Sequence, residues 1–139
     1  MDPHLEPGDP LGLHRVLPEA DPEAPVPLPQ RATRLDADPT KIFESEILVE
    51  VETLNIDAAS FRQMEEASNG ELTKVGELVL ATVAKRGKQH NPVTGSGGML
   101  VGKVKRVGAF VSERGVTVGD RIATLASLSL TPLSLKRVI

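Results

Sequence analysis

Three histidines in this sequence could carry a proton near neutral pH, because the pKa of histidine is ordinarily about 6.5. His90 lies in the polar cluster Lys88-Gln89-His90-Asn91-Pro92, where it could take part in a reaction or serve as a solvated or capping residue. His4 falls in a loose N-terminal stretch, and His14 could pack beneath the segment around it. The three are too widely spaced to bind a metal ion together, so the sequence predicts no metal site.

A glycine-rich stretch follows His90, and it raises the question of phosphate binding because glycine lets a backbone approach an anion closely. The stretch reads Asn91-Pro92-Val93-Thr94-Gly95-Ser96-Gly97-Gly98. A dinucleotide fingerprint follows a strand and opens a helix, whereas these glycines follow a predicted helix and open a predicted strand. After Gly95 and Gly97, the third position of G-x-G-x-x-G falls on Leu100. We therefore interpret the glycines as a tight turn before a strand, which could also line a cleft.

Composition excludes several other classes of function. The chain has no cysteine, which rules out disulfides, thiolate catalysis and zinc sites that use sulfur. The net charge is −3 with both signs mixed along the chain, and three phenylalanines are the only aromatic residues of the Phe, Trp and Tyr set. Neither a basic stripe nor a stacking platform for nucleic acid can form. No apolar run reaches the roughly 18–20 residues of a membrane helix. The N-terminus is acidic and proline-rich, unlike a secretory signal, so we expect a cytoplasmic protein without membrane contact.

The hydrophobic pattern predicts the elements that would position these residues. Alternating β-branched residues favour strands at 46–54, 99–107 and 121–126. Apolar residues three and four apart favour a helix at 71–86, and a shorter helical stretch at 58–67 precedes it. Glycines within the later strands are typical of a curved, barrel-like sheet.

Proline divides the chain near residue 40, because nine of the eleven prolines lie before that point. Proline fixes φ and removes a backbone donor, so this part cannot be a regular helix or a central strand. We predict a disordered extension at 1–11, an extended arm at 12–40 that docks through apolar side chains, and a folded domain at 41–139. A fully disordered tail is the alternative for the proline-rich part.

Several blocks of the sequence resemble the L-erythro-3,5-diaminohexanoate dehydrogenase family, from about residue 12 to the end. They are Gly12 with His14-Arg15-Val16, Thr53-Leu54-Asn55-Ile56-Asp57, the run from Arg86 to Met99, and Ser127-Leu128-Ser129-Leu130-Thr131-Pro132-Leu133. The order of elements, with the turn Val118-Gly119-Asp120-Arg121, also resembles the front of medium-chain dehydrogenases. This implies a mainly β fold with helices: an incomplete, GroES-like β-barrel catalytic domain without a Rossmann domain.

The resemblance implies chemistry without zinc. Zinc-dependent medium-chain dehydrogenases carry a cysteine at the position of Asn55 and a Gly-His-Glu triplet near Gly95-Ser96-Gly97, so both ligand positions are empty here. Zinc helps an alcohol by stabilising the alkoxide as hydride leaves. A neutral amine carries its own lone pair, so its oxidation depends more on a base and an aligned pocket. Zinc-free quinone and enoyl reductases leave a second enzymatic interpretation open.

The family's reaction would be oxidative deamination of L-erythro-3,5-diaminohexanoate to 5-amino-3-oxohexanoate and ammonium in lysine fermentation, with hydride passing to NAD. On that basis Asp57 could pair with a substrate ammonium, and Lys88 or His90 could meet the carboxylate. His90 could also shuttle a proton. Hydrogen bonds to the substrate or the nicotinamide could come from Asn55, Thr94 and Ser96. In the alternative, Asp57 is a helix cap, Lys88 a surface charge, and Thr94 and Ser96 are turn residues.

NAD would be bound mainly by a domain that this sequence lacks, since no strand is followed by a glycine fingerprint and a helix. We therefore expect a truncated product, a partial reading frame or one part of a split enzyme, inactive and unable to bind NAD alone. Its partners would be the diamino acid and the missing Rossmann half, and the complete enzyme would be a homo-oligomer. A non-enzymatic GroES-like binding module is the third interpretation.

Overall fold

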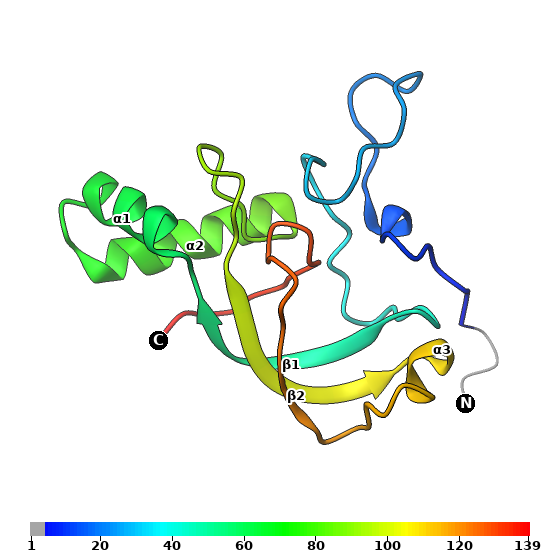
Figure 1. Ribbon diagram of the computed structural model, residues 1–139. Coiled ribbons are helices and arrows are strands. Elements are labelled where there is room, and N and C mark those ends of the chain that lie inside the picture. Colours follow the sequence, from blue (N-terminus) through cyan, green and yellow to red (C-terminus); the bar gives the residue numbers. More distant parts are fainter. Residues whose placement is uncertain (1–4) are drawn as a thin grey trace.

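The computed structural model describes residues 5–139 and contains a three-stranded antiparallel sheet in the order β1-β2-β3, which runs along the lower edge of the view in Figure 1. The strands are β1 (Ile47–Asn55), β2 (Met99–Val107) and β3 (Arg121–Ala123). All three lie where the alternating pattern predicted strands, although β3 is shorter than expected.

The sheet bends where β1 and β2 lose their regular register, between Val51 and Thr53 and between Leu48 and Val49. Gly102 of β2 permits the close approach, because a Cβ there would lie 2.3 Å from the carbonyl oxygen of Glu50. Three strands do not close on themselves, so the fold is a small mixed α/β domain. The GroES-like barrel remains a prediction.

Two antiparallel helices cover one end of the sheet, α1 (Ala58–Ala67) and α2 (Leu72–Arg86) (Figure 1). Both confirm the predicted helices. The turn between them places Asn69 and Gly70 at φ 51° and 78°, and Gly87 ends α2 at φ 65°, the left-handed region that glycine adopts readily. A short helix, α3 (Ala109–Ser112), and a 3₁₀ turn at Leu13–Arg15 were not predicted. No helix among residues 5–139 is both long enough and apolar enough to cross a bilayer.

The core lies between α2, the sheet and the C-terminal segment. Val79 and Val83 of α2 pack with Leu133, and partly buried apolar side chains surround them, namely Val51, Leu54, Ile56, Met64 and Leu135. The apolar stripe of α2 is narrower than predicted. The buried residues of α2 are spaced four apart, at Val75, Val79 and Val83. Leu72 in the first turn is 67% exposed, and Leu78, beside this row of valines, is 38% exposed.

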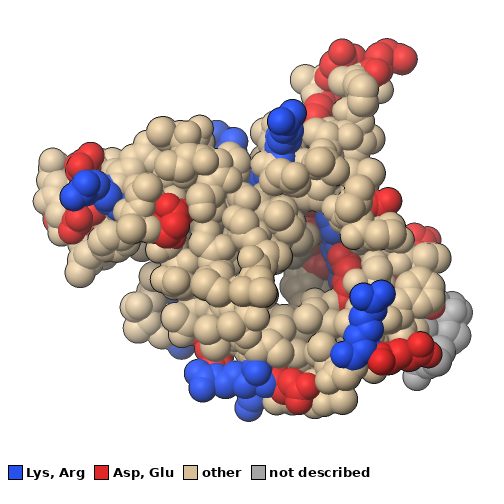
Figure 2. Space-filling model, viewed as in Figure 1, with Lys and Arg blue, Asp and Glu red and all other residues tan. Residues whose placement is uncertain are grey.

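One part of the proline-rich arm packs against the C-terminal end of α2. Ala32 and Leu35 are buried, and Leu35 N–H donates to the carbonyl of Arg86 at 2.8 Å. The stretch at 18–28 instead projects from the body as a loop (Figure 1), and Figure 2 shows acidic side chains at its tip. Of the extension predicted at 1–11, residues 1–4, with His4, lie outside the described residues. Within the rest, the carbonyl of Glu6 accepts from Glu44 N–H at 2.9 Å.

Candidate substrate-binding site

The glycine-rich turn folds back on itself and lies directly on the end of β1. Asn91 N–H donates to the carbonyl of Ser96 at 2.8 Å, and Gly95 N–H donates to the carbonyl of Asn91 at 2.8 Å. Gly98 has φ +88°, and a Cβ there would lie 2.0 Å from the carbonyl oxygen of Asn55. These glycines therefore make a tight turn and a close backbone contact before β2, as the sequence predicted.

Asp57 is the N-cap of α1, the structural alternative considered for it. Its carboxylate accepts from the backbone N–H of Ser60 at 3.0 Å and from the Ser60 hydroxyl at 2.5 Å. Burial raises the pKa of this carboxyl, but hydrogen bonds from Ser60 and Ser96 outweigh that effect and hold the pKa below its usual value. Asp57 is thus a carboxylate at neutral pH, at the point where the glycine-rich turn meets α1.

A buried polar contact that the sequence did not predict joins the same two elements. The side-chain amide of Asn91 donates to the hydroxyl of Ser60 at 3.0 Å, and both residues are buried. The side-chain oxygen Oδ1 of Asn91 accepts from Val93 N–H at 2.8 Å, which shapes the tip of the turn. Asp57-x-x-Ser60 is a recognisable helix-start pattern, but nothing local to the sequence pairs Ser60 with Asn91.

The three remaining hydrogen-bonding candidates gather around this junction. Asn55 is exposed at the end of β1, with Gly98 packed on its carbonyl. The hydroxyl of Thr94 accepts from Ser96 N–H at 3.3 Å, and Ser96 reaches Asp57 from the turn. The structure therefore brings four predicted residues together at one edge of the domain, namely Asn55, Asp57, Thr94 and Ser96.

His90 lies at the base of the turn and is half-buried. Its Nδ1 atom is buried and has no hydrogen-bond partner among the described residues. Burial, and then the charges of Lys88 and Arg86, lower the pKa of His90 below its usual value. A neutral imidazole at neutral pH can accept a proton, as a general base must.

Lys88 points away from the turn and into the arm. Its side chain is fully buried, and Nζ donates to the carbonyls of Pro29 at 2.7 Å and Gln30 at 3.3 Å. Burial, followed by the charge of Arg86, lowers the pKa of Lys88 to about 8, while Glu19 acts in the opposite direction. The alternative that Lys88 is a charged surface residue is therefore wrong, because the folded arm encloses its side chain.

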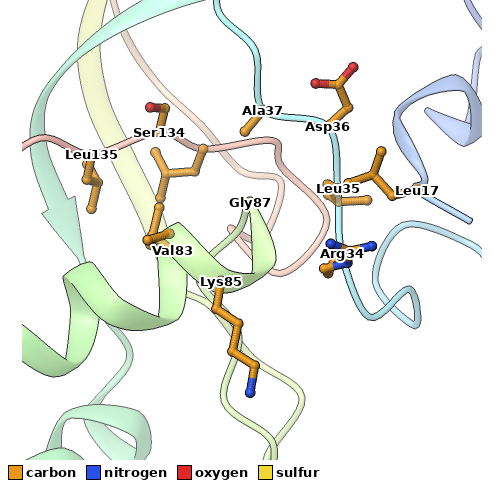
Figure 3. A pocket seen from close by; sticks show the side chains of 12 residues that line it. Leu17, Arg34, Leu35, Asp36, Ala37, Val83, Lys85, Gly87, Ser134 and Leu135 are labelled. Atoms are coloured by element: carbon orange, nitrogen blue, oxygen red, sulfur yellow. The ribbon is translucent and has the colours of Figure 1, made fainter. Parts of the chain in front are cut away.

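Two cavities lie away from these residues. One of about 390 Å³ is bounded by the arm, the end of α2 and the C-terminal segment (Figure 3). Its charged side chains do not converge, since Asp36 and Lys85 point in opposite directions in that view. The other, of about 320 Å³, lies between the sheet and the arm, where Figure 2 shows the surface hollowed. None of the six predicted residues lines either cavity.

The glycine-rich turn does not fit the phosphates of a dinucleotide. The space that a Cβ of Gly97 would fill is occupied by the chain's own backbone, with the carbonyl oxygen of Gln89 at 2.3 Å and the nitrogen of Ser129 at 2.4 Å. The turn also leads into β2 and not into a helix, and the N-terminus of α1 that it meets is already capped by the carboxylate of Asp57. Residues 5–139 likewise contain no group of three or more His, Asp or Glu side chains that could hold a metal ion.

Comparison with known proteins decides the family. The family model described as "L-erythro-3,5-diaminohexanoate dehydrogenase N-terminal domain" matches residues 14–139. The chain belongs to this family. All six predicted site residues lie inside the matched region of the diaminohexanoate dehydrogenase domain.

Two curated relatives carry the name L-erythro-3,5-diaminohexanoate dehydrogenase. The protein from Fusobacterium nucleatum is 46% identical over 136 residues, which cover 97% of this chain and 38% of the relative. The protein from Acetoanaerobium sticklandii is 45% identical over 129 residues, covering 92% of this chain and 36% of the relative. The chain thus spans somewhat more than a third of the length of these diaminohexanoate dehydrogenases.

Proposed function

We propose that this chain is the N-terminal, substrate-side part of a cytoplasmic enzyme that oxidatively deaminates L-erythro-3,5-diaminohexanoate to 5-amino-3-oxohexanoate in lysine fermentation. The supporting observation is 46% identity to a named diaminohexanoate dehydrogenase across 97% of this chain. The names of the relatives favour this reaction over the quinone or enoyl reductases and the binding module.

The polar edge formed by β1, α1 and the glycine-rich turn suits a substrate with two ammonium groups and a carboxylate. Asp57 carries the negative charge that an ammonium requires, and its lowered pKa keeps it ionised. Asn55, Thr94 and Ser96 add hydrogen-bonding groups beside it. Because Asp57 also caps α1, its position is fixed by the backbone before a substrate arrives.

His90 is the proposed proton acceptor. Oxidation of an amine requires the neutral form of the amino group, so one proton must leave the substrate ammonium first. His90 is neutral at neutral pH because burial and two nearby cations lower its pKa. Lys88 is less suited to meet the substrate carboxylate directly, since its Nζ already donates to two arm carbonyls inside the protein.

NAD, as the proposed cofactor, would accept the hydride and would be held mainly by a part of the enzyme beyond these 139 residues. We propose that no metal takes part and that the chain alone is inactive. The amine lone pair supplies the electron density that zinc secures for an alcohol substrate.

A chimera tests the proposed function. This chain would replace the matching 136 residues of the Fusobacterium nucleatum relative. We expect the chimera to reduce NAD with 3,5-diaminohexanoate, and the His90→Gln chimera to be at least tenfold slower below the pH at which the substrate amine is already neutral. A folded chimera that binds NAD but leaves the diamino acid unchanged would contradict the proposal. Assays with a quinone and an enoyl thioester would identify a reductase.

A further inference from the structure

Lys88 is the largest of the fully buried side chains among the described residues. Burial of an ammonium is costly unless hydrogen bonds replace the lost water. Within the described part of the chain, Nζ of Lys88 donates to two main-chain carbonyls from one short stretch of the arm, Pro29 at 2.7 Å and Gln30 at 3.3 Å. Lys88, just after the C-terminal end of α2, therefore hydrogen-bonds to the backbone of a segment 59 residues earlier in the chain.

The two acceptors belong to a tight turn of the arm. Arg31 N–H and Ala32 N–H both donate to the carbonyl of Leu28, at 2.9 and 3.0 Å. The carbonyls of Pro29 and Gln30 are left at the end of this turn, much as the last carbonyls of a helix are. A cation placed there satisfies them and stabilises the turn.

The backbone on either side of Lys88 joins the arm to the glycine-rich turn. Before it, Gly87 lies against the arm so closely that a Cβ would come 2.0 Å from the carbonyl oxygen of Leu35. After it, the carbonyl oxygen of Gln89 would lie 2.3 Å from a Cβ at Gly97 in the turn. Only two residues, Gln89 and His90, separate Lys88 from Asn91, where the closed turn begins.

We propose that Lys88 is a positioning residue that fastens the proline-rich arm to the base of the glycine-rich turn, so that arm and turn open together as one unit. The Lys88 side chain holds the arm, and its backbone leads within three residues into the turn. When the arm detaches from Lys88, the ammonium becomes exposed to solvent, and the segment that carries His90 is free to move. This coupling follows from the contacts of the chain and is independent of the reaction that the enzyme catalyses.

Amide hydrogen exchange of the 139-residue chain tests the coupling. Lys88→Met keeps an unbranched side chain that is one heavy atom shorter, and it removes the charge and the hydrogen bonds. We expect at least tenfold faster exchange at Ala32 and Leu35 in the arm and at Asn91 and Gly95 in the turn. Exchange at Val83 in the core of α2 should be unchanged, which separates local opening from unfolding. Lys85→Met, at an exposed lysine on the same helix end, is the matched control and should leave all five amides unchanged.

Faster exchange in the arm with an unchanged turn would overturn the proposal, as would no change in either. If Lys88→Met does not fold, the wild-type chain gives the answer in low concentrations of denaturant. Amides of the arm and of the turn should then exchange through one common opening with the same denaturant dependence, below that of Val83. Two separate openings, with different denaturant dependences, would show that the two segments are not coupled.

Discussion

Arg15, which is buried, and Glu46, which is half-buried, form a two-point ion pair across 31 residues of sequence. Nε and Nη2 of Arg15 donate to the two carboxylate oxygens of Glu46 at 2.8 and 2.7 Å, and Arg15 is only 6% exposed. The guanidinium also donates to the carbonyl of Lys41 at 2.9 Å. The pair ties the start of the arm to the residue before β1.

Removal of the Arg15 side chain should destabilise the protein strongly, because the Glu46 carboxylate, of which only 19% is exposed, would lose its main partner. We expect Arg15→Ala to lower the free energy of unfolding by about 3–5 kcal/mol. Arg121→Ala breaks an ion pair of equal length, 2.8 Å to Glu52, at a side chain that is 68% exposed. That control should cost less than about 1 kcal/mol. Denaturant titrations of the two variants give the comparison, and equal losses would contradict it.

Acid should remove the contribution of the Glu46 carboxylate to the free energy of unfolding. Burial raises the pKa of this carboxyl, but hydrogen bonds from Arg15, Phe43 N–H and His14 outweigh it and hold the pKa below the usual 4.5. The folded state therefore releases this proton more readily than the unfolded state. Its stabilisation is complete above pH 4.5 and is lost as the pH falls through the lower, folded value. Glu46→Gln should show a shallower loss of stability on acidification than the wild type, and parallel curves would refute this.

Gly98 should tolerate alanine far less well than Gly95, although both have positive φ. At Gly98 an added Cβ would lie 2.0 Å from the Asn55 carbonyl oxygen, whereas at Gly95 nothing lies within 4 Å. We expect Gly95→Ala to cost about 1 kcal/mol, from backbone strain alone. Gly98→Ala should cost more than about 2 kcal/mol and displace the turn from β1. Thermal unfolding measures both, and similar melting temperatures for the two variants would contradict the close contact.

Two substitutions at Asp57 separate capping from charge. Asp57→Ala removes the cap of α1 and should cost about 1 kcal/mol of stability. Asp57→Asn keeps a capping oxygen for Ser60 N–H, so it should cost only a few tenths of a kcal/mol while removing the negative charge. In the chimera with the longer relative, Asp57→Asn should raise the KM for the diamino acid at least tenfold. An unchanged KM would leave Asp57 with the capping role alone.

The sequence predicted the regular elements because their signals are local. The boundaries of α1, α2 and β2 follow from periodicity and from Gly87, all within a few residues. The contacts that shape the candidate site are not local. Lys88 meets Pro29 over 59 residues, and Asn91 meets Ser60 over 31. Composition and spacing carry no information about such pairs, so the sequence predicts Lys88 at the substrate carboxylate or on the surface, although the arm encloses it.

The buried ammonium of Lys88 should make the protein more stable in mild alkali. Burial, then Arg86, lower its pKa to about 8 from the usual 10.5. Between these two values the unfolded chain holds the proton and the folded chain does not, so the free energy of unfolding rises with pH through that interval. The difference of 2.5 pKa units, 10.5 minus 8, sets an upper limit of about 3 kcal/mol.

The lowered pKa of His90 does not affect this interval, because histidine titrates below it. Denaturant titrations at pH 7, 9 and 10.5, which lie about one unit on either side of the folded value and at the unfolded one, would measure the rise. Lys88→Met lacks the titrating group and should show no such rise, whereas Lys85→Met should behave as the wild type does. If the wild type and Lys88→Met lose stability in parallel over this range, the ammonium of Lys88 is not buried in solution. The arm would then not enclose the Lys88 side chain.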